Sequence, residues 1–204
     1  MNILETVLVV SLFLLYLGLW KMKQVSQKKR TGIDPKVMAG STSGIQKYMN
    51  RFMNVLTVYA VAVIILHATG IQIGSLFSRV ETMNVMAFDV IGFVIGLAGL
   101  SLCLYAQVKM GSSWRVGIDE KVPTDLVTTG LYQFIRNPTY VGLFILNLGV
   151  WLIWPTWTIF LLNFCFVIFL EIQVRCEEDF LLLTHGQEYS DYKNRTKRYF
   201  PFLY

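Results

Sequence analysis

Five long runs of apolar residues, separated by polar segments, divide this 204-residue chain. The runs cover residues 3–20, 52–77, 86–108, 140–154 and 156–174. A helix needs about 18 to 25 such residues to cross about 30 Å of hydrocarbon, and no run alternates as the strands of a membrane barrel do. The pattern predicts an all-α, polytopic membrane helical bundle of about five transmembrane helices. The last two runs, of about 15 and 19 residues, are near or below this length, which leaves open whether both fully span the bilayer.

Composition supports the membrane class, since 54% of the residues are hydrophobic, only 15% are charged, and the mean hydropathy is +0.52. The first run has no basic segment before it and no small-residue cleavage site after it, so we expect a retained helix rather than a signal peptide. No internal repeat divides the chain. We expect one domain, residues 1–204, with a three-helix part (1–108) and a C-terminal part (109–204) that holds a hairpin (138–174) and a final segment (175–204).

Basic residues are distributed unevenly between the apolar runs. All of them except Arg79 lie in residues 21–51, residues 109–136 or the tail after residue 174. By the positive-inside rule these segments are cytoplasmic and the N-terminus is outside, which agrees with an odd number of helices. The net charge of +5 therefore reflects membrane topology, and we expect no nucleic-acid partner.

The cysteines and histidines form no metal-binding pattern. Cys103 and Cys165 lie inside apolar runs, Cys176 is expected at a helix start, and no pair has metal or disulfide spacing. His67 and His185 are too isolated for a zinc site. We expect free thiols, structural or surface histidines, and no metal.

Candidate chemistry lies at the two ends of the predicted hairpin, which its fold brings together. Pro138 suits the first position of a helix and Asn137 suits its N-cap. Since a helix start is electropositive, this one, with Arg136 before it, could hold a carboxylate or another anion. The alternative is that Arg136 is a topology charge that extends to lipid headgroups.

Polar and charged residues at the end of the last apolar run fall on two faces of the predicted helix. Glu171, Arg175 and Asp179 follow one another at four-residue spacing, as in an ion-pair ladder. Gln173 and Glu177 share a different face, with no basic residue on the same stripe. A carboxylate at the membrane interface without a cation indicates a functional site.

Four motifs occur in a fixed order in the C-terminal half. They are TGLYQFIRNPTYVG at 129–142, EE at 177–178, GQEYSDY at 186–192 and RYFP at 198–201. Together with the helix pattern of the whole chain, they resemble the isoprenylcysteine carboxyl methyltransferase family and its bacterial and archaeal membrane relatives.

The resemblance implies an integral membrane methyltransferase that uses S-adenosylmethionine and releases S-adenosylhomocysteine. Its cofactor pocket would be closed on the cytoplasmic side by a C-terminal helix. The protein would lie in a prokaryotic inner membrane, and a lipophilic or small methyl acceptor would enter from the lipid bilayer. It implies catalytic roles for Arg136 and Glu177, with Glu177 receiving the cofactor's amino group. The other implied cofactor-binding residues are Leu126, Val127, Tyr132, Asn137, Pro138, Thr139 and Tyr140.

Two positions depart from that family's pattern. Asn137 stands where the family commonly has histidine, and Gln173 stands where the carboxyl methyltransferases place an arginine for the substrate carboxylate. A neutral Gln173 suits a thiol, phenol, amine or amide-bearing acceptor better than a carboxylate, unless Arg175 turns inward. Gln173 and Arg175 are therefore the substrate-binding candidates, and a place in the ladder is the alternative for Arg175.

Other functions remain open from the sequence. A phospholipid N-methyltransferase shares the general C-terminal pattern. In a non-enzymatic membrane protein, Glu177 and Arg136 would only pair with each other and the chain's own tail would fill the pocket. A transporter or channel is disfavoured, because the sequence lacks repeats and mid-membrane charges.

Overall fold

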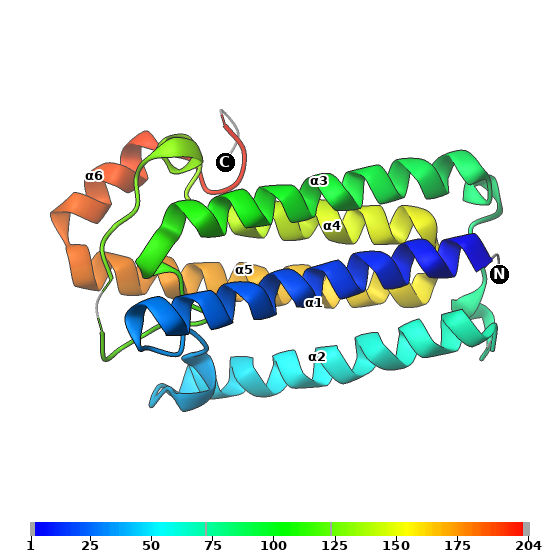
Figure 1. The fold of residues 1–204 in the computed structure, drawn as a ribbon, viewed down its shortest axis with the longest axis horizontal. Helices are drawn as coiled ribbons and strands as arrows, with labels where there is room; N and C mark the ends of the chain where they lie inside the picture. The colour runs from blue at the N-terminus through cyan, green and yellow to red at the C-terminus, as the bar shows by residue number, and fades with distance from the viewer. Residues whose placement is uncertain (1–2, 72, 123, 202–204) are drawn as a thin grey trace.

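A computed structural model describes residues 3–71, 73–122 and 124–201 and shows a bundle of helices lying side by side (Figure 1). At one end of the bundle, the loop between α3 and α4, the C-terminal helix α6 and the C-terminal segment lie close together, while the N-terminus lies at the other end (Figure 1). The helices are α1 (Ile3–Thr31), α2 (Gly44–Thr69), α3 (Met86–Met110), α4 (Pro138–Ile153), α5 (Trp157–His185) and α6 (Gln187–Arg195). Short 3-10 helices lie at Met38–Gly40, Ser75–Phe77, Glu81–Met83, Gly111–Ser113 and Gly130–Gln133.

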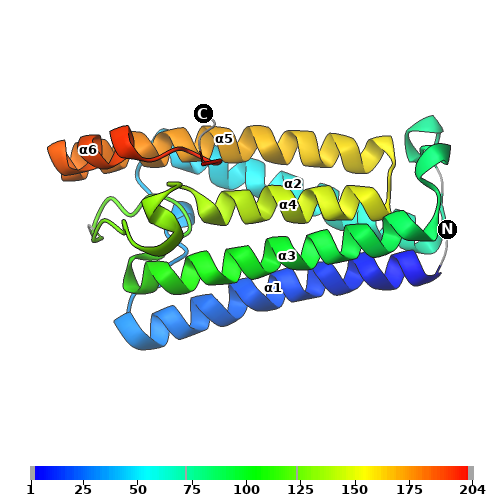
Figure 2. The same ribbon diagram turned by 90° about the horizontal axis from the view of Figure 1, so that it is seen from above.

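Four of these helices, α1, α2, α3 and α5, are long and apolar enough to cross a membrane, and α4 is a shorter apolar helix of 16 residues. At 1.5 Å per residue α4 measures about 24 Å, less than the hydrocarbon thickness. It lies between α3 and α5 (Figure 2). The predicted all-helical membrane bundle is confirmed.

Several predicted boundaries were wrong. The first and last apolar runs continue as helix into charged sequence, so α1 reaches Thr31 and α5 reaches His185. Lysine, arginine and glutamate are good helix formers, so a fall in hydropathy marks the end of the apolar part and not of the helix. Cys176 accordingly lies inside α5, not at a helix start.

The helix that contains the second apolar run begins and ends earlier than the predicted bounds of 52–77. It begins at Gly44 and ends at Thr69, because Gly70 adopts a left-handed φ of 73° and Ile71 N donates to Leu66 O at 3.1 Å. This is the usual glycine-terminated end of a helix.

Glycines let α3 and α4 approach closely. A Cβ at Gly99 would lie 2.5 Å from Gly142 O, and one at Gly92 would lie 2.6 Å from Gly149 O. Small residues at a helix interface permit this contact. It fixes the position of α4, whose first residues belong to the site described below.

The end of the bundle that holds the N-terminus has its own polar contacts. Arg79 Nη1 lies 2.7 Å from Glu5 Oε1, and Arg79 Nη2 lies 4.0 Å from Asp89 Oδ1. His67, buried in α2, makes a hydrogen bond of 2.8 Å to Thr158 Oγ1. His67 is therefore structural, as expected, and the described residues contain no group of three metal-binding side chains. The three cysteines are free, also as expected.

Candidate functional site

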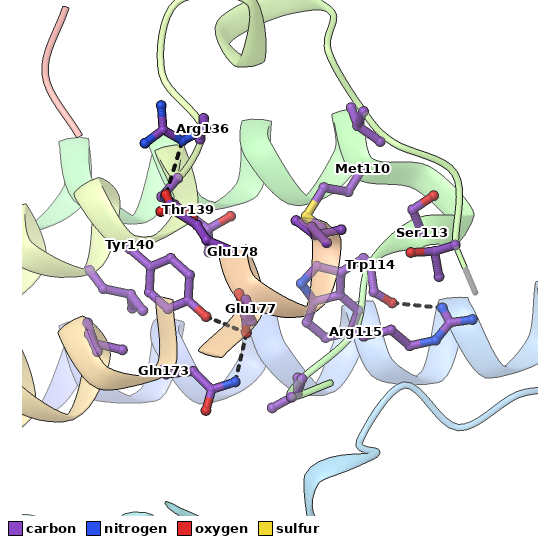
Figure 3. A pocket seen from close by; sticks show the side chains of 18 of the residues that line it. Met110, Ser113, Trp114, Arg115, Arg136, Thr139, Tyr140, Gln173, Glu177 and Glu178 are labelled. Atoms are coloured by element: carbon purple, nitrogen blue, oxygen red, sulfur yellow. Dashed lines mark hydrogen bonds and ion pairs between the residues drawn. The ribbon is translucent and has the colours of Figure 1, made fainter. Parts of the chain in front are cut away.

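A cavity opens at the end of the bundle where α6 and the loop between α3 and α4 lie (Figure 3). Its walls come from α1, α2, that loop, and the facing parts of α4, α5 and α6. Nine of the residues that the sequence singled out line it: Leu126, Val127, Tyr132, Arg136, Asn137, Thr139, Tyr140, Gln173 and Glu177. The hairpin of α4 and α5 thus brings together residues separated by more than thirty positions in sequence.

Two of the predicted site residues do not line the cavity. Pro138 is buried as the first residue of α4, where its fixed φ and missing N–H suit a helix start. Arg175 points away from the cavity with 54% of its side chain exposed, and its Nη2 lies 2.7 Å from Glu171 Oε1. The predicted ion pair between Arg175 and Glu171 is therefore confirmed.

Glu177 faces the cavity from α5, between Tyr140 and Gln173 (Figure 3). Its Oε1 accepts hydrogen bonds from the Tyr140 hydroxyl at 2.8 Å and from Gln173 Nε2 at 2.9 Å. Among the described residues, no lysine or arginine lies within ion-pair distance of this carboxylate. The carboxylate is held in place by neutral donors, so its charge remains available to a cationic ligand.

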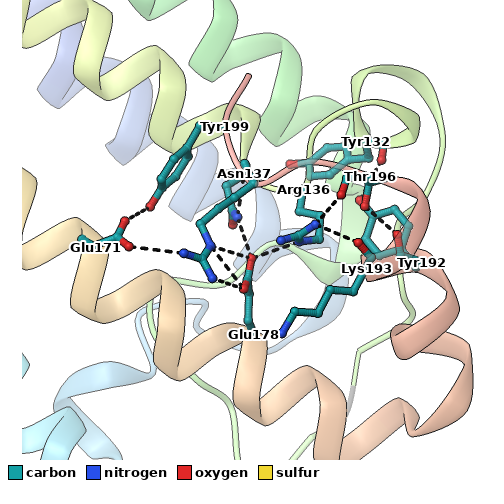
Figure 4. A network of polar contacts seen from close by, with 10 residues as sticks. Tyr132, Arg136, Asn137, Glu171, Glu178, Tyr192, Lys193, Thr196 and Tyr199 are labelled. Atoms are coloured by element: carbon teal, nitrogen blue, oxygen red, sulfur yellow. Dashed lines mark hydrogen bonds and ion pairs between the residues drawn. The ribbon is translucent and has the colours of Figure 1, made fainter. Parts of the chain in front are cut away.

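Glu178, the next residue, belongs to a separate network (Figure 4). Its carboxylate lies 3.0 Å from Arg136 Nε and 2.9 Å from Arg198 Nη2, and it is 3% exposed. A buried carboxylate needs such partners, because its desolvation is otherwise very unfavourable. No individual role for Glu178 was predicted from the sequence. The signal was present, since Leu170, Val174 and Glu178 follow one another at four-residue spacing on the buried face of α5.

Arg136 was predicted to help hold an anionic group, but its guanidinium is paired within the protein. Besides Glu178, its Nη1 donates to Lys193 O at 3.1 Å and to Thr196 O at 2.6 Å (Figure 4). The guanidinium is therefore occupied by the protein, although it lines the cavity. The pair of Arg136 with Glu177 that the non-enzymatic alternative required is not formed.

The C-terminal segment is attached beside the start of α4. Arg136 N donates to Lys197 O at 2.8 Å, and Lys197 N donates to Phe134 O at 3.0 Å, in a short parallel bridge. Tyr192 OH donates to Tyr132 O at 2.7 Å and so attaches α6 to the loop before α4. Since Tyr189 and Tyr192 of α6 also line the cavity, this C-terminal helix forms one of its walls.

Asn137 occupies the N-cap position of α4 but does not cap it. Its Nδ2 donates to Glu178 Oε1 and Arg198 O, both at 3.4 Å, and no side chain of the described residues caps this helix. The predicted cap was wrong, because these two hydrogen bonds from Nδ2 hold the side chain toward Glu178 and the C-terminal segment. The uncapped first turn, with Thr139 and Tyr140, lies in the cavity wall.

Aromatic side chains make up much of the remaining wall. Burial raises the pKa of the Tyr132 phenol, so the phenol stays protonated and donates to Ala106 O at 3.4 Å. Trp114, in the loop after α3, is 2% exposed and was not singled out as a site residue. The only sequence signal for it was a tryptophan in an otherwise polar loop. The apolar side of the cavity also includes Tyr16, Trp20, Met53, Phe166 and Phe169.

Comparisons with known proteins agree on one family. The family model described as phospholipid methyltransferase matches residues 87–188. The chain is 27% identical over 141 residues to methanethiol S-methyltransferase of Crocosphaera subtropica, a match that covers 67% of this chain and 54% of that protein. It is 32% identical over 129 residues to human protein-S-isoprenylcysteine O-methyltransferase, covering 60% of this chain and 44% of the human one. The chain thus spans about half the length of the curated relatives that it matches.

A solved structure shows the same fold. The structure of the eukaryotic intramembrane Ras methyltransferase, isoprenylcysteine carboxyl methyltransferase, matches 79% of this chain and 54% of that one, with a TM-score of 0.52 and 22% identity. Since the family model covers half of the chain and the helix arrangement agrees, the chain belongs to the phospholipid methyltransferase family of membrane proteins, within which it resembles the isoprenylcysteine carboxyl methyltransferases.

Proposed function

We propose that this protein is a methyltransferase that uses S-adenosylmethionine to methylate a small or lipophilic acceptor in the cavity beside Glu177. The observation that carries the proposal is the Glu177 carboxylate, which faces the cavity, is held by two neutral donors and has no cation among the described residues. A carboxylate held in this way attracts an ammonium or sulfonium group.

The residues present fit the cofactor. Glu177 suits the α-ammonium group, and the uncapped first turn of α4 offers backbone N–H groups to the carboxylate. The faces of Tyr132, Tyr140 and Trp114 suit a sulfonium. Tyr189 adds a buried hydroxyl in the wall that has no hydrogen-bond partner among the described residues, as expected where a polar ligand binds.

The cofactor supplies a methyl group on a positively charged sulfur. A lone pair of the acceptor forms a bond to the methyl carbon, and the electrons of the broken carbon–sulfur bond remain on sulfur. The protein's task is then to hold the two reactants in line and to exclude water. The apolar side of the cavity, with Phe166 and Phe169, serves the second purpose. Leu126 and Val127 also line the cavity and would contact the cofactor.

The charges in the cavity favour an uncharged acceptor over a carboxylate. Arg115 and Arg136 are the described lining residues with positive charge, and each is already paired, Arg115 with Asp119 at 3.2 Å and Arg136 with Glu178 at 3.0 Å. Gln173 is neutral, and Arg175 points outward to Glu171. A thiol or an amine therefore suits the site better than a carboxylate. An amine acceptor would make the protein a phospholipid N-methyltransferase, the second candidate.

The distribution of positive charge supports a cytoplasmic location for this end of the bundle. The basic segments 21–51 and 109–136 and the tail all reach the end that holds the cavity. The N-terminus then lies on the opposite side of the membrane, and the donor reaches its pocket from the cytoplasm.

Isothermal titration with S-adenosylhomocysteine tests the proposal on the purified chain in detergent micelles. We expect binding by the wild type, loss of binding in Glu177→Ala, and retention in Asp179→Ala, which alters an exposed acid two residues away. Equal behaviour of the two variants would contradict a cofactor role for Glu177. Transfer of a labelled methyl group to thiol, amine and carboxylate acceptors then separates the acceptor classes.

A further inference from the structure

A chain of amide hydrogen bonds leads from a loop backbone to Glu177. Ile118 N donates to Gln46 Oε1 at 3.2 Å, Gln46 Nε2 donates to Gln173 Oε1 at 3.3 Å, and Gln173 Nε2 donates to Glu177 Oε1 at 2.9 Å. Gln46 is 0% exposed and Gln173 is 2% exposed, so water does not compete for these groups. These hydrogen bonds join three parts of the molecule, namely the loop after α3, helix α2 and helix α5.

The direction of this chain is fixed at both ends. A backbone N–H can only donate, so Gln46 must present its oxygen to Ile118 and its NH₂ to Gln173. An ionised carboxylate can only accept, so Gln173 must present its NH₂ to Glu177 and its oxygen to Gln46. A flip of either amide would place two donors or two acceptors against each other.

The loop after α3, from which the first of these hydrogen bonds comes, is itself part of the cavity wall. Arg115, Val116 and Gly117 line it, and Val116 is held by hydrogen bonds from Val116 N to Pro35 O at 2.8 Å and from Met38 N to Val116 O at 3.1 Å. Gly117 packs closely here, since a Cβ on it would lie 3.1 Å from Gln46 Oε1. Gln46 thus connects this loop with the Glu177 carboxylate through Gln173.

We propose that Gln46, which does not line the cavity, is a positioning residue for Glu177: through Gln173 it fixes which end of the Gln173 amide faces the carboxylate. The inference rests on the proposed function, because it assigns Gln46 a contribution to the affinity for the methyl donor. Without Gln46, the Gln173 amide loses one of the two groups that orient it, so its NH₂ is held toward Glu177 less firmly. A supporting group outside the binding shell that fixes a ligand in this way commonly contributes strongly to affinity.

A double-mutant cycle tests the inference by titration with S-adenosylhomocysteine. We expect Gln46→Met, which keeps the volume of the side chain but removes both hydrogen bonds, to raise the Kd about tenfold in the wild-type background. In a Gln173→Met background, the same change is expected to alter the Kd less than twofold, because the amide through which Gln46 acts is gone. The matched control is Gln107→Met, since Gln107 is also 0% exposed but its amide has no hydrogen-bond partner among the described residues.

Gln46→Glu guards against a simple loss of folding. Its carboxylate still accepts from Ile118 N but cannot donate to Gln173, so we expect it to weaken binding as Gln46→Met does. An unchanged Kd in both Gln46 variants, or an equal loss in both backgrounds, would overturn the role of Gln46 while leaving the proposed function intact. Absence of binding by the wild type would overturn the proposed function, and this inference with it.

Discussion

Glu177 and Glu178 are neighbours in α5, yet they belong to two different networks. Glu177 faces the cavity and accepts hydrogen bonds from Tyr140 and Gln173, whereas Glu178 is buried against Arg136 and Arg198. Adjacent residues on a helix point about 100° apart, so the two carboxylates meet different elements. Glu177 is the proposed ligand-binding group, and Glu178 holds the C-terminal segment in place.

Tyr140 is expected to support cofactor binding through its hydroxyl. Tyr140→Phe removes the 2.8 Å donor to Glu177 and leaves the ring in the wall. A hydrogen bond to a charged group contributes about 1.5 to 3 kcal/mol, so the Kd for S-adenosylhomocysteine should rise at least about tenfold in calorimetry. Tyr48→Phe, at an exposed position of α2, is the control and should leave the Kd unchanged.

Glu178 is expected to matter for stability. Glu178→Gln removes the charge that balances Arg136 and Arg198, and breaking a buried ion pair on one side costs about 3 to 5 kcal/mol. The midpoint of thermal unfolding in detergent micelles should fall well below that of the wild type. Asp179→Asn changes the exposed acid next in sequence and should unfold within about 0.5 kcal/mol of the wild type. Equal midpoints for the two variants would contradict the network in Figure 4.

The polar cluster at the other end of the bundle is expected to act on stability alone. Arg79→Met leaves Glu5 and Asp89, each 4% exposed, without their cation. Stability should fall by about 3 to 5 kcal/mol, while the Kd for S-adenosylhomocysteine stays as in the wild type. The matched control is Arg51→Met, on the exposed surface of α2. A changed Kd in folded Arg79→Met protein would mean that the two ends are coupled.

The close contact of α3 and α4 is expected to tolerate no added methyl group. In Gly99→Ala the new Cβ would lie 2.5 Å from Gly142 O, and overpacking of this kind costs about 1 to 3 kcal/mol. Gly18→Ala, in the interior of α1 with nothing within 4 Å, should instead keep or raise the unfolding midpoint. The two variants differ only in their surroundings, so similar midpoints would count against the glycine contact.

The sequence by itself determined the helical membrane architecture and the start of α4 at Pro138. These follow from local rules, namely the length of apolar runs, the fixed φ of proline and the spacing of residues along a helix. Most of the predicted residues that line the cavity were instead implied by the resemblance of the motifs to a known family. The same local rules placed Gln173 and Glu177 on one face of α5, where their side chains form a hydrogen bond.

Only the tertiary structure decided which partner each polar group takes. Arg136 pairs with Glu178 rather than with a ligand, Asn137 turns from its helix to that same carboxylate, and Gln46 joins the site from a helix more than a hundred residues away in sequence. The physical reason is that these contacts cross between helices. Periodicity fixes the face of a helix on which a side chain lies, but the packing of the other helices determines which groups meet that face.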